Sequence, residues 1–211
     1  MNNLDIDVLV NKYYRLSKDY VPNDLIVLDQ NEKNFHNYIY PELKPTISKT
    51  IYDDYKLLEQ ASIKDGFHIV VDSGYRDFFY QMKIWIESYK KNYKEFKREE
   101  KADIKAYDKT NKYVAWPGTS EHQTGYAFDI GAYRNNVFHE VLPEDEEIKW
   151  MIENSYKYGF ILRYPKNKEN ITGICYEPWH YRYVGPEIAN IIYNNGDYLT
   201  LEEYHKVLRR K

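Results

Sequence analysis

Two short motifs that lie far apart in the sequence place the strongest constraint on the fold of this chain. The first is Ser120-Glu-His122-Gln-Thr-Gly125-Tyr-Ala127-Phe-Asp129, and the second is Glu177-Pro-Trp-His180. Each motif alone is a weak signal, but together they supply two imidazoles and one carboxylate. Such a set can hold a zinc ion in a tetrahedron and leave the fourth position for water. The fold therefore has to bring the two motifs together.

Glu177, the acid of the second motif, is not needed as a ligand and is free to move protons. Zinc lowers the pKa of a bound water molecule to about 7, and a nearby glutamate that takes the proton completes a hydrolytic site. Gly125 and Ala127 fit a pocket in which the backbone approaches closely. The His-Glu-x-x-His pattern of many zinc proteases is absent, since Pro143 stands where His139-Glu140 would need its second histidine. The residues themselves predict hydrolysis, most simply of an amide.

Both motifs, together with Ser73-Gly-Tyr-Arg76, resemble the D-Ala-D-Ala metallopeptidases, and within them the VanY and VanXY carboxypeptidases of vancomycin resistance. The stretch from Tyr158 to Gly185 is also similar to that group. This resemblance implies an α+β fold, like that of hedgehog domains and D,D-peptidases, with a central antiparallel sheet that carries the zinc site and helices that flank it. It also implies one Zn²⁺ per chain and a D-Ala-D-Ala-ending peptide or peptidoglycan precursor as substrate.

The resemblance also implies a role for individual residues. The zinc ligands would be His122, Asp129 and His180, and the general base would be Glu177. Arg76 would bind the substrate carbonyl as negative charge develops on its oxygen. Four further residues would bind the substrate: Ser120 and Gln81 at the terminal carboxylate of the peptide, and Tyr75 and Trp179 as walls of the pocket.

Three residues and one segment also have a plainer interpretation. Arg76 could pair with a surface acid such as Asp77, and Gln81 could be an ordinary solvated helix residue. Cys175, two residues before Glu177, is typical of a small buried side chain rather than a nucleophile. The segment between Tyr89 and Trp116 could form a lid over the site or a solvent-exposed helix hairpin, and its mixture of lysines and acids favours the hairpin.

Composition agrees with one enzyme domain over residues 1–211. The net charge of −3 offers no field that would attract nucleic acid. The single cysteine excludes an internal disulfide. The start of the chain lacks the basic and apolar regions of a signal peptide, and no apolar run is long enough to span a membrane. The sequence as written predicts a cytoplasmic protein, or an extracytoplasmic one if an N-terminal anchor has been removed.

Hydrophobic periodicity and turn residues predict the order of elements. We expect helices over about 46–63, from Asp77 onward, from Pro143 to Gly159, over 186–193 and from Leu201 onward. The last of these helices begins with the capping box Thr200-Leu-Glu-Glu203. We expect strands over 67–71, 126–130, 160–164, 171–176 and 179–184, with a turn at Thr124-Gly125 that lets His122 and Asp129 share a site.

The residues favour zinc hydrolysis, and the resemblance implies a D,D-carboxypeptidase that removes D-alanine from D-Ala-D-Ala ends, with cleavage of the free dipeptide as a second activity. An L,D-carboxypeptidase that trims tetrapeptide stems could share the whole set of residues. A zinc-stabilised protein that binds peptidoglycan without cleaving it is the alternative from another class. The presence of Glu177 argues against the binding protein, because a non-catalytic site needs no base.

Overall fold

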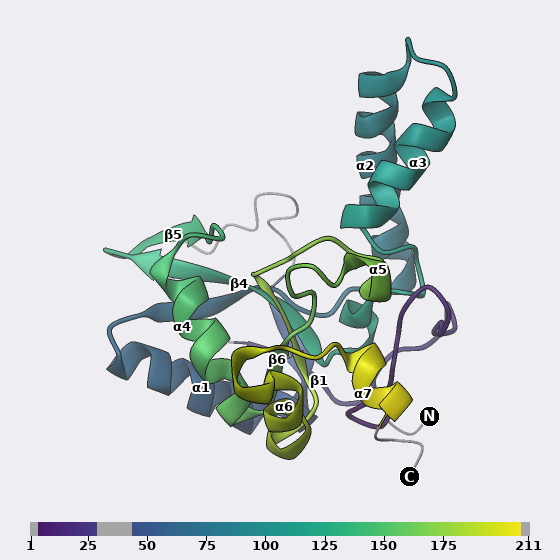
Figure 1. The fold of residues 1–211 in the computed structure, drawn as a ribbon. Coiled ribbons are helices and arrows are strands. Elements are labelled where there is room, and N and C mark those ends of the chain that lie inside the picture. Colours follow the sequence, from purple (N-terminus) through teal and green to yellow (C-terminus); the bar gives the residue numbers. More distant parts are fainter. Residues whose placement is uncertain (1–3, 29–43, 208–211) are drawn as a thin grey trace.

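The computed structural model describes residues 4–28 and 44–207, in which an antiparallel sheet lies at the centre of the molecule (Figure 1). Four strands follow the order β3-β4-β7-β6, and β5 pairs with the far end of β4. Their bounds are His68–Ser73 (β3), Ala127–Arg134 (β4), Val137–Glu140 (β5), Phe160–Leu162 (β6) and His180–Tyr183 (β7). A separate two-stranded sheet joins β1 (Leu25–Val27) to β2 (Thr46–Ser48). The predicted α+β class with an antiparallel sheet is confirmed.

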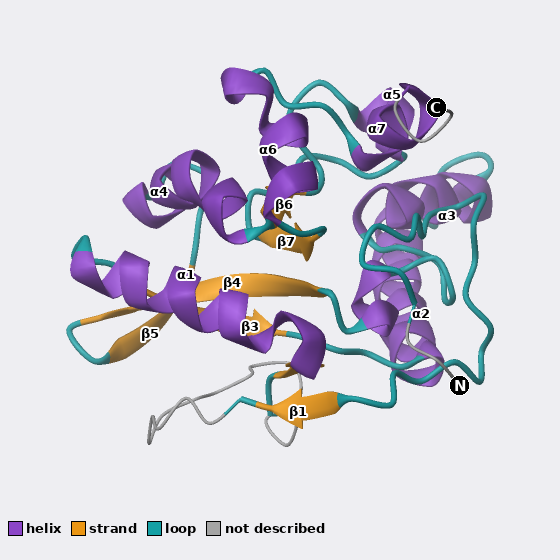
Figure 2. Ribbon diagram, turned by 90° about the horizontal axis from the view of Figure 1, so that it is seen from below, coloured by secondary structure: helices purple, strands orange, loops and turns teal. Residues whose placement is uncertain are grey.

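The two faces of the central sheet carry different side chains. Successive side chains of a strand point to opposite faces, so Phe128 and Ile130 of β4 point away from Asp129. Phe128 and Ile130 belong to the main hydrophobic core, together with Tyr181 of β7. Helices α1 (Tyr52–Lys64) and α4 (Glu146–Asn154) cover this core (Figure 2) and contribute buried residues to it. The opposite face carries Asp129 toward one end of β4 and a small hydrophobic cluster of Val70, Tyr133 and Phe138 toward the other.

Most of the predicted elements are present. Strand β3 matches the predicted run at 67–71, β4 extends the one at 126–130, and β6 and β7 fall within the predicted strands near the C-terminus. Helix α4 continues into a 3-10 turn, Ser155–Tyr158, and ends at Gly159, which adopts a left-handed conformation. Helices α6 (Pro186–Tyr193) and α7 (Leu201–Val207) also form. Both hydrogen bonds of the predicted capping box, between Thr200 and Glu203, are made.

An antiparallel helix hairpin projects from the body of the molecule (Figure 1). It consists of α2 (Phe78–Phe96) and α3 (Ala102–Tyr113). Hydrogen bonds from Trp85 to Asn111 and from Asn92 to Thr110 join the two helices. The stretch from Tyr89 to Trp116 is therefore the helix hairpin that its charge pattern favours, and only the base of the hairpin reaches the site.

Two of the predicted elements are wrong at least in part. Residues 46–48 form strand β2 rather than the first turn of a helix, because they pair with β1 and the Ser48 side chain then caps the next turn. Residues 171–176 are not a strand. A one-turn helix, α5 (Glu169–Thr172), ends at Gly173 in a left-handed conformation, and the chain then turns to the base of the hairpin, where the Cys175 N–H donates to Lys112 O. Strands β1 and β5 were not predicted.

The start of α2 offers a test of the fold. Asp77 is the N-cap, and its carboxylate accepts a hydrogen bond from the Tyr80 N–H at 2.7 Å. We expect Asp77→Ala to lower the free energy of unfolding by about 1 kcal/mol, measured by urea denaturation. Lys101→Ala is the control, because Lys101 occupies the N-cap of α3 without a side-chain cap. Equal effects of the two changes would contradict the capping role.

Candidate metal centre

The two motifs meet on the face of the central sheet opposite the main core. Asp129 of β4 and His180 of β7 are direct cross-strand partners, and opposite residues of this kind project to the same face. His180 Nδ1 lies 3.0 Å from Asp129 Oδ1, and His122 Nε2 lies 3.4 Å from Asp129 Oδ2. One ligand atom from each of the three residues lies within 4.8 Å of the other two. The structure therefore brings together the three predicted zinc ligands.

A short turn places His122 beside the sheet. His122 lies in a 3-10 turn, Glu121–Thr124, which ends at Gly125 with a φ of 72°. This left-handed residue reverses the chain before β4 begins, as the turn expected at Thr124-Gly125 requires. His122 Nδ1 lies 2.7 Å from Gly74 O, so its Nε2 faces the other two residues. A backbone carbonyl that holds the second nitrogen is a common arrangement around metal-binding histidines.

The donor set fits a divalent cation. Burial alone would raise the pKa of Asp129, but its neighbours His122 and Arg76 hold that pKa well below the usual range. Burial lowers the pKa of His122 to about 4, and the charge of Arg76 acts in the same direction. His180 differs: burial would lower its pKa, but its acidic neighbours Asp129 and Glu121 raise it to about 9. Metal binding would have to displace the proton of His180, so affinity should rise with pH.

Glu177 stands next to the cluster without belonging to it. It lies three residues before His180, the first residue of β7, and its Oε2 lies 3.9 Å from His180 Nδ1. Burial raises the pKa of Glu177 to about 7, and the charge of His180 opposes that rise. A carboxyl group whose pKa lies near neutrality can both accept and return a proton, which is the behaviour of a general acid–base catalyst.

Arg76 lies on the other side of Asp129. Its Nη2 is 2.5 Å from Asp129 Oδ2, and its Nε donates to Ser73 Oγ at 3.0 Å. Asp77 instead caps α2, so the alternative in which Arg76 pairs with Asp77 is wrong. Within the described part of the chain, Nη1 of Arg76 makes no hydrogen bond. It is thus the atom available to a ligand.

A cavity of about 200 Å³ opens over these residues. Ser120, Gln81 and Trp179 line it together with the three clustered residues, Glu177 and Arg76. The buried Gln81 side chain donates to Ala115 O, while its Oε1 has no partner among the described residues. Tyr75 does not line the cavity, although the adjacent Arg76 does, and burial raises the pKa of the Tyr75 hydroxyl to about 12. Cys175 is also absent from the lining.

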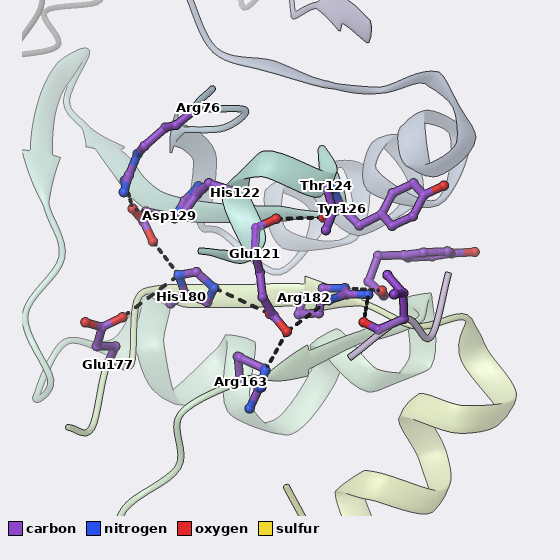
Figure 3. A network of polar contacts seen from close by, with 12 residues as sticks. Arg76, Glu121, His122, Thr124, Tyr126, Asp129, Arg163, Glu177, His180 and Arg182 are labelled. Carbon is purple, nitrogen blue, oxygen red and sulfur yellow. Dashed lines mark hydrogen bonds and ion pairs between the residues drawn. The ribbon is translucent and has the colours of Figure 1, made fainter. Parts of the chain in front are cut away.

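Sequence reasoning missed a buried group of charged residues beneath the cluster (Figure 3). Glu121 Oε1 lies 2.8 Å from Arg163 Nε and 2.9 Å from Arg182 Nη1, and all three side chains are buried. Tyr164, whose ring lies 4.9 Å from that of His180, was also missed as a wall of the cavity. The sequence did contain a signal for this group: a glutamate inside the first motif and arginines within predicted apolar strands. Because buried charges are normally paired, these residues could have been expected to contact one another.

Comparison with known proteins agrees with this geometry. A sequence model of the VanY family, described as D-alanyl-D-alanine carboxypeptidase, matches residues 44–186. The chain belongs to this family. It is 44% identical over 147 residues to a D-alanyl-D-alanine carboxypeptidase of Enterococcus faecalis, covering 70% of this chain and 51% of that protein. It is 32% identical over 203 residues to VanXYC of Enterococcus gallinarum, a bifunctional D-Ala-D-Ala dipeptidase and D-Ala-D-Ala carboxypeptidase. This match covers 95% of this chain and 93% of VanXYC.

Solved structures of several carboxypeptidases share the fold. The LD-carboxypeptidase LdcB is 40% identical with a TM-score of 0.74, over 94% of this chain and 84% of that one. VanYB in complex with D-Ala-D-Ala is 36% identical with a TM-score of 0.76, over 96% and 98%. A mutant of the D,D-pentapeptidase VanY in complex with Zn(II) is 37% identical with a TM-score of 0.75, over 94% and 98%. These proteins are hydrolytic peptidases, and so is this family member.

No helix within residues 4–28 and 44–207 has both the length and the apolar character to cross a bilayer.

The ligand assignment can be tested through metal content. Removing the carboxylate that lies between the two histidines should abolish a three-ligand zinc site, so we expect Asp129→Ala to retain less than about one hundredth of the zinc affinity. The measurement is zinc content after dialysis, with far-UV circular dichroism as a check on folding. His139→Ala on β5 is the control and should keep its zinc. A folded Asp129→Ala protein with full zinc content would reject the assignment.

Proposed function

We propose that this protein is a zinc-dependent D,D-carboxypeptidase, which hydrolyses the last peptide bond of D-Ala-D-Ala-ending peptidoglycan precursors. The observation that supports it most directly is the cluster of His122, Asp129 and His180 with Glu177 and Arg76 on its two sides. Three ligands, a separate base and a separate cation are the parts that metal-assisted amide hydrolysis requires. Relatives named for D-Ala-D-Ala support the substrate.

Each residue would have one task in the reaction. A bound zinc ion would supply Lewis acidity and lower the pKa of a water molecule. Glu177 would take the proton of that water molecule and then pass it to the leaving amine of D-alanine. Arg76 would hold the carbonyl oxygen through Nη1 as negative charge develops on it. Ser120 and Gln81, whose Oε1 has no partner in the described part of the chain, would position the terminal residue of the peptide.

The separation of ligands from base leads to a sharp prediction. Glu177→Ala should keep the zinc ion but lower kcat by several orders of magnitude, because it removes the proton carrier and no ligand. Zinc content and kcat are measured on the same preparation. Glu140→Ala, which removes a carboxylate of β5 outside the metal cavity, is the control and should be active. Loss of zinc from Glu177→Ala, or near-normal turnover, would contradict the proposed base.

A second cavity supports a substrate longer than a dipeptide. It measures about 600 Å³ and shares Ala115, Tyr164 and Ile174 with the metal cavity. Lys12, Arg15 and Lys112 line it, and none of them forms an ion pair with another described residue. A peptide that enters the metal cavity with its C-terminus could therefore leave its remaining residues in the larger space. The cations favour a stem with an acidic residue ahead of D-Ala-D-Ala.

Charge reversal in this cleft tests the larger cavity. We expect Arg15→Glu to raise KM for an acidic pentapeptide stem roughly three- to tenfold, the scale of a surface charge interaction, and to leave KM for the free dipeptide unchanged. Lys18→Glu makes the same change outside the cavity and serves as the control. Salt should reduce the difference between Arg15→Glu and the wild type. Identical changes with both substrates would remove the cleft from the binding site.

Product analysis decides between the related activities. The zinc-loaded protein is incubated with a D-Ala-D-Ala pentapeptide, the free dipeptide and a tetrapeptide stem, each with and without chelator, and the products are identified by mass spectrometry. We expect the pentapeptide to lose one D-alanine without chelator and to stay intact with it. Cleavage of the free dipeptide would show that the protein is also a D-Ala-D-Ala dipeptidase. Cleavage of the tetrapeptide alone would make the protein an L,D-carboxypeptidase, as its 40% identity to LdcB allows. Binding without cleavage would indicate a zinc-stabilised binding protein.

A further inference from the structure

Glu121 is a buried carboxylate that the proposed reaction does not use. It immediately precedes His122, and its side chain points to the interior, where none of its surface is exposed. Among the described residues, arginines engage one of its oxygens: Oε1 lies 2.8 Å from Arg163 Nε and 2.9 Å from Arg182 Nη1. The two guanidinium groups compensate the cost of burying the charge and hold the pKa of Glu121 well below its usual range, although burial acts in the opposite direction.

The second oxygen of Glu121 faces a metal-cluster histidine. Oε2 lies 3.9 Å from His180 Nε2, and Figure 3 shows the histidine ring between Glu121 and Asp129. Both Oε2 and Nε2 are buried, and neither has a hydrogen-bond partner among the described residues. Two buried polar atoms of opposite character that face each other, each otherwise without a partner, form a natural donor–acceptor pair.

The orientation of His180 indicates what a hydrogen bond between these two atoms would do. Nδ1 of His180 faces Asp129 Oδ1 at 3.0 Å, on the side of the metal cluster. A neutral imidazole that binds a metal through one nitrogen carries its proton on the other, and the acceptor of that proton fixes the tautomer. We infer that Glu121 is a positioning residue for His180, whose Nε2–H it accepts so that Nδ1 is presented to the metal. This inference rests on the metal site of the proposed function.

The surroundings of Glu121 hold it in place for this role. Arg163 also binds Glu202 of α7 through both terminal nitrogens, at 2.9 and 2.7 Å. Arg182 donates to the backbone carbonyls of Ile6 and Val8. Contacts with the N-terminal segment hold Arg182, and contacts with α7 hold Arg163. The Glu121 carboxylate, which lies between the two arginines, therefore has little freedom to rotate. The N-terminal segment and α7 thereby support the orientation of a metal-binding histidine.

A simpler role for Glu121 would be to neutralise the arginines, and Glu202 provides the matched control. Both glutamates pair with Arg163, but only Glu121 faces His180. We compare Glu121→Gln and Glu202→Gln by zinc affinity in chelator competition, by the visible spectrum of the Co²⁺ form and by urea unfolding. Positioning predicts that Glu121→Gln weakens zinc binding about 10- to 100-fold and changes the Co²⁺ spectrum, whereas Glu202→Gln changes affinity less than threefold. Equal losses in both variants, or none in Glu121→Gln, would overturn the inference.

A measurement on the wild type keeps the test decisive even if Glu121→Gln fails to fold. In zinc-loaded protein labelled with ¹⁵N-histidine, Nε2 of His180 should give the signal of a protonated nitrogen and Nδ1 that of a metal-bound one. The reverse assignment would overturn the inference. These readouts do not depend on turnover. A protein that shows the expected pattern but cleaves no peptide would reject the proposed function alone, and a wild type that binds no zinc would reject both.

Discussion

The pairing of β4 with β7 is the contact on which the rest of this structure depends. It sets Asp129 directly opposite His180, so two segments that are far apart in the sequence deliver their side chains to one face of one sheet. A shift of one residue in this register would turn His180 toward the hydrophobic core and Tyr181 toward the site. The core under α1 and α4, to which Phe128 and Tyr181 belong, therefore stabilises the register as well as the fold.

The sequence predicted which residues would meet on the sheet more reliably than it predicted the residues that support them. His122, Asp129, His180 and Glu177 were recognisable because their residue types and spacing have a chemical meaning that does not depend on neighbours. The family resemblance placed Tyr75 in the pocket, but Tyr75 does not line the cavity, although the adjacent Arg76 does. A motif thus identifies candidate residues for the chemistry, while the direction of each neighbouring side chain depends on the tertiary structure.

The errors in secondary structure have a similar origin. Residues 46–48 continue a helical pattern of apolar residues, yet hydrogen bonds to β1 are available to them and they form β2. Residues 171–176 have the apolar character of a strand, but Gly173 adopts a left-handed conformation and the segment turns to meet the hairpin. In both segments the local preference is weak, and a partner distant in the sequence decides the outcome. Long elements such as α2 were predicted because their own periodicity and caps suffice.

Charge is distributed in two layers around the proposed metal site. The cavity layer contains Asp129, Glu177 and Arg76, which line the cavity, and the buried layer contains Glu121 with its two arginines. The buried layer carries a compensated charge in the interior, an arrangement that contributes little net stability compared with apolar packing. Its value to the protein would then lie in geometry: it presents a fixed, ionised acceptor to His180 from the side that the substrate cannot reach. On the proposed mechanism, the face that lines the cavity would change its protonation during turnover while the orientation of His180 stays constant.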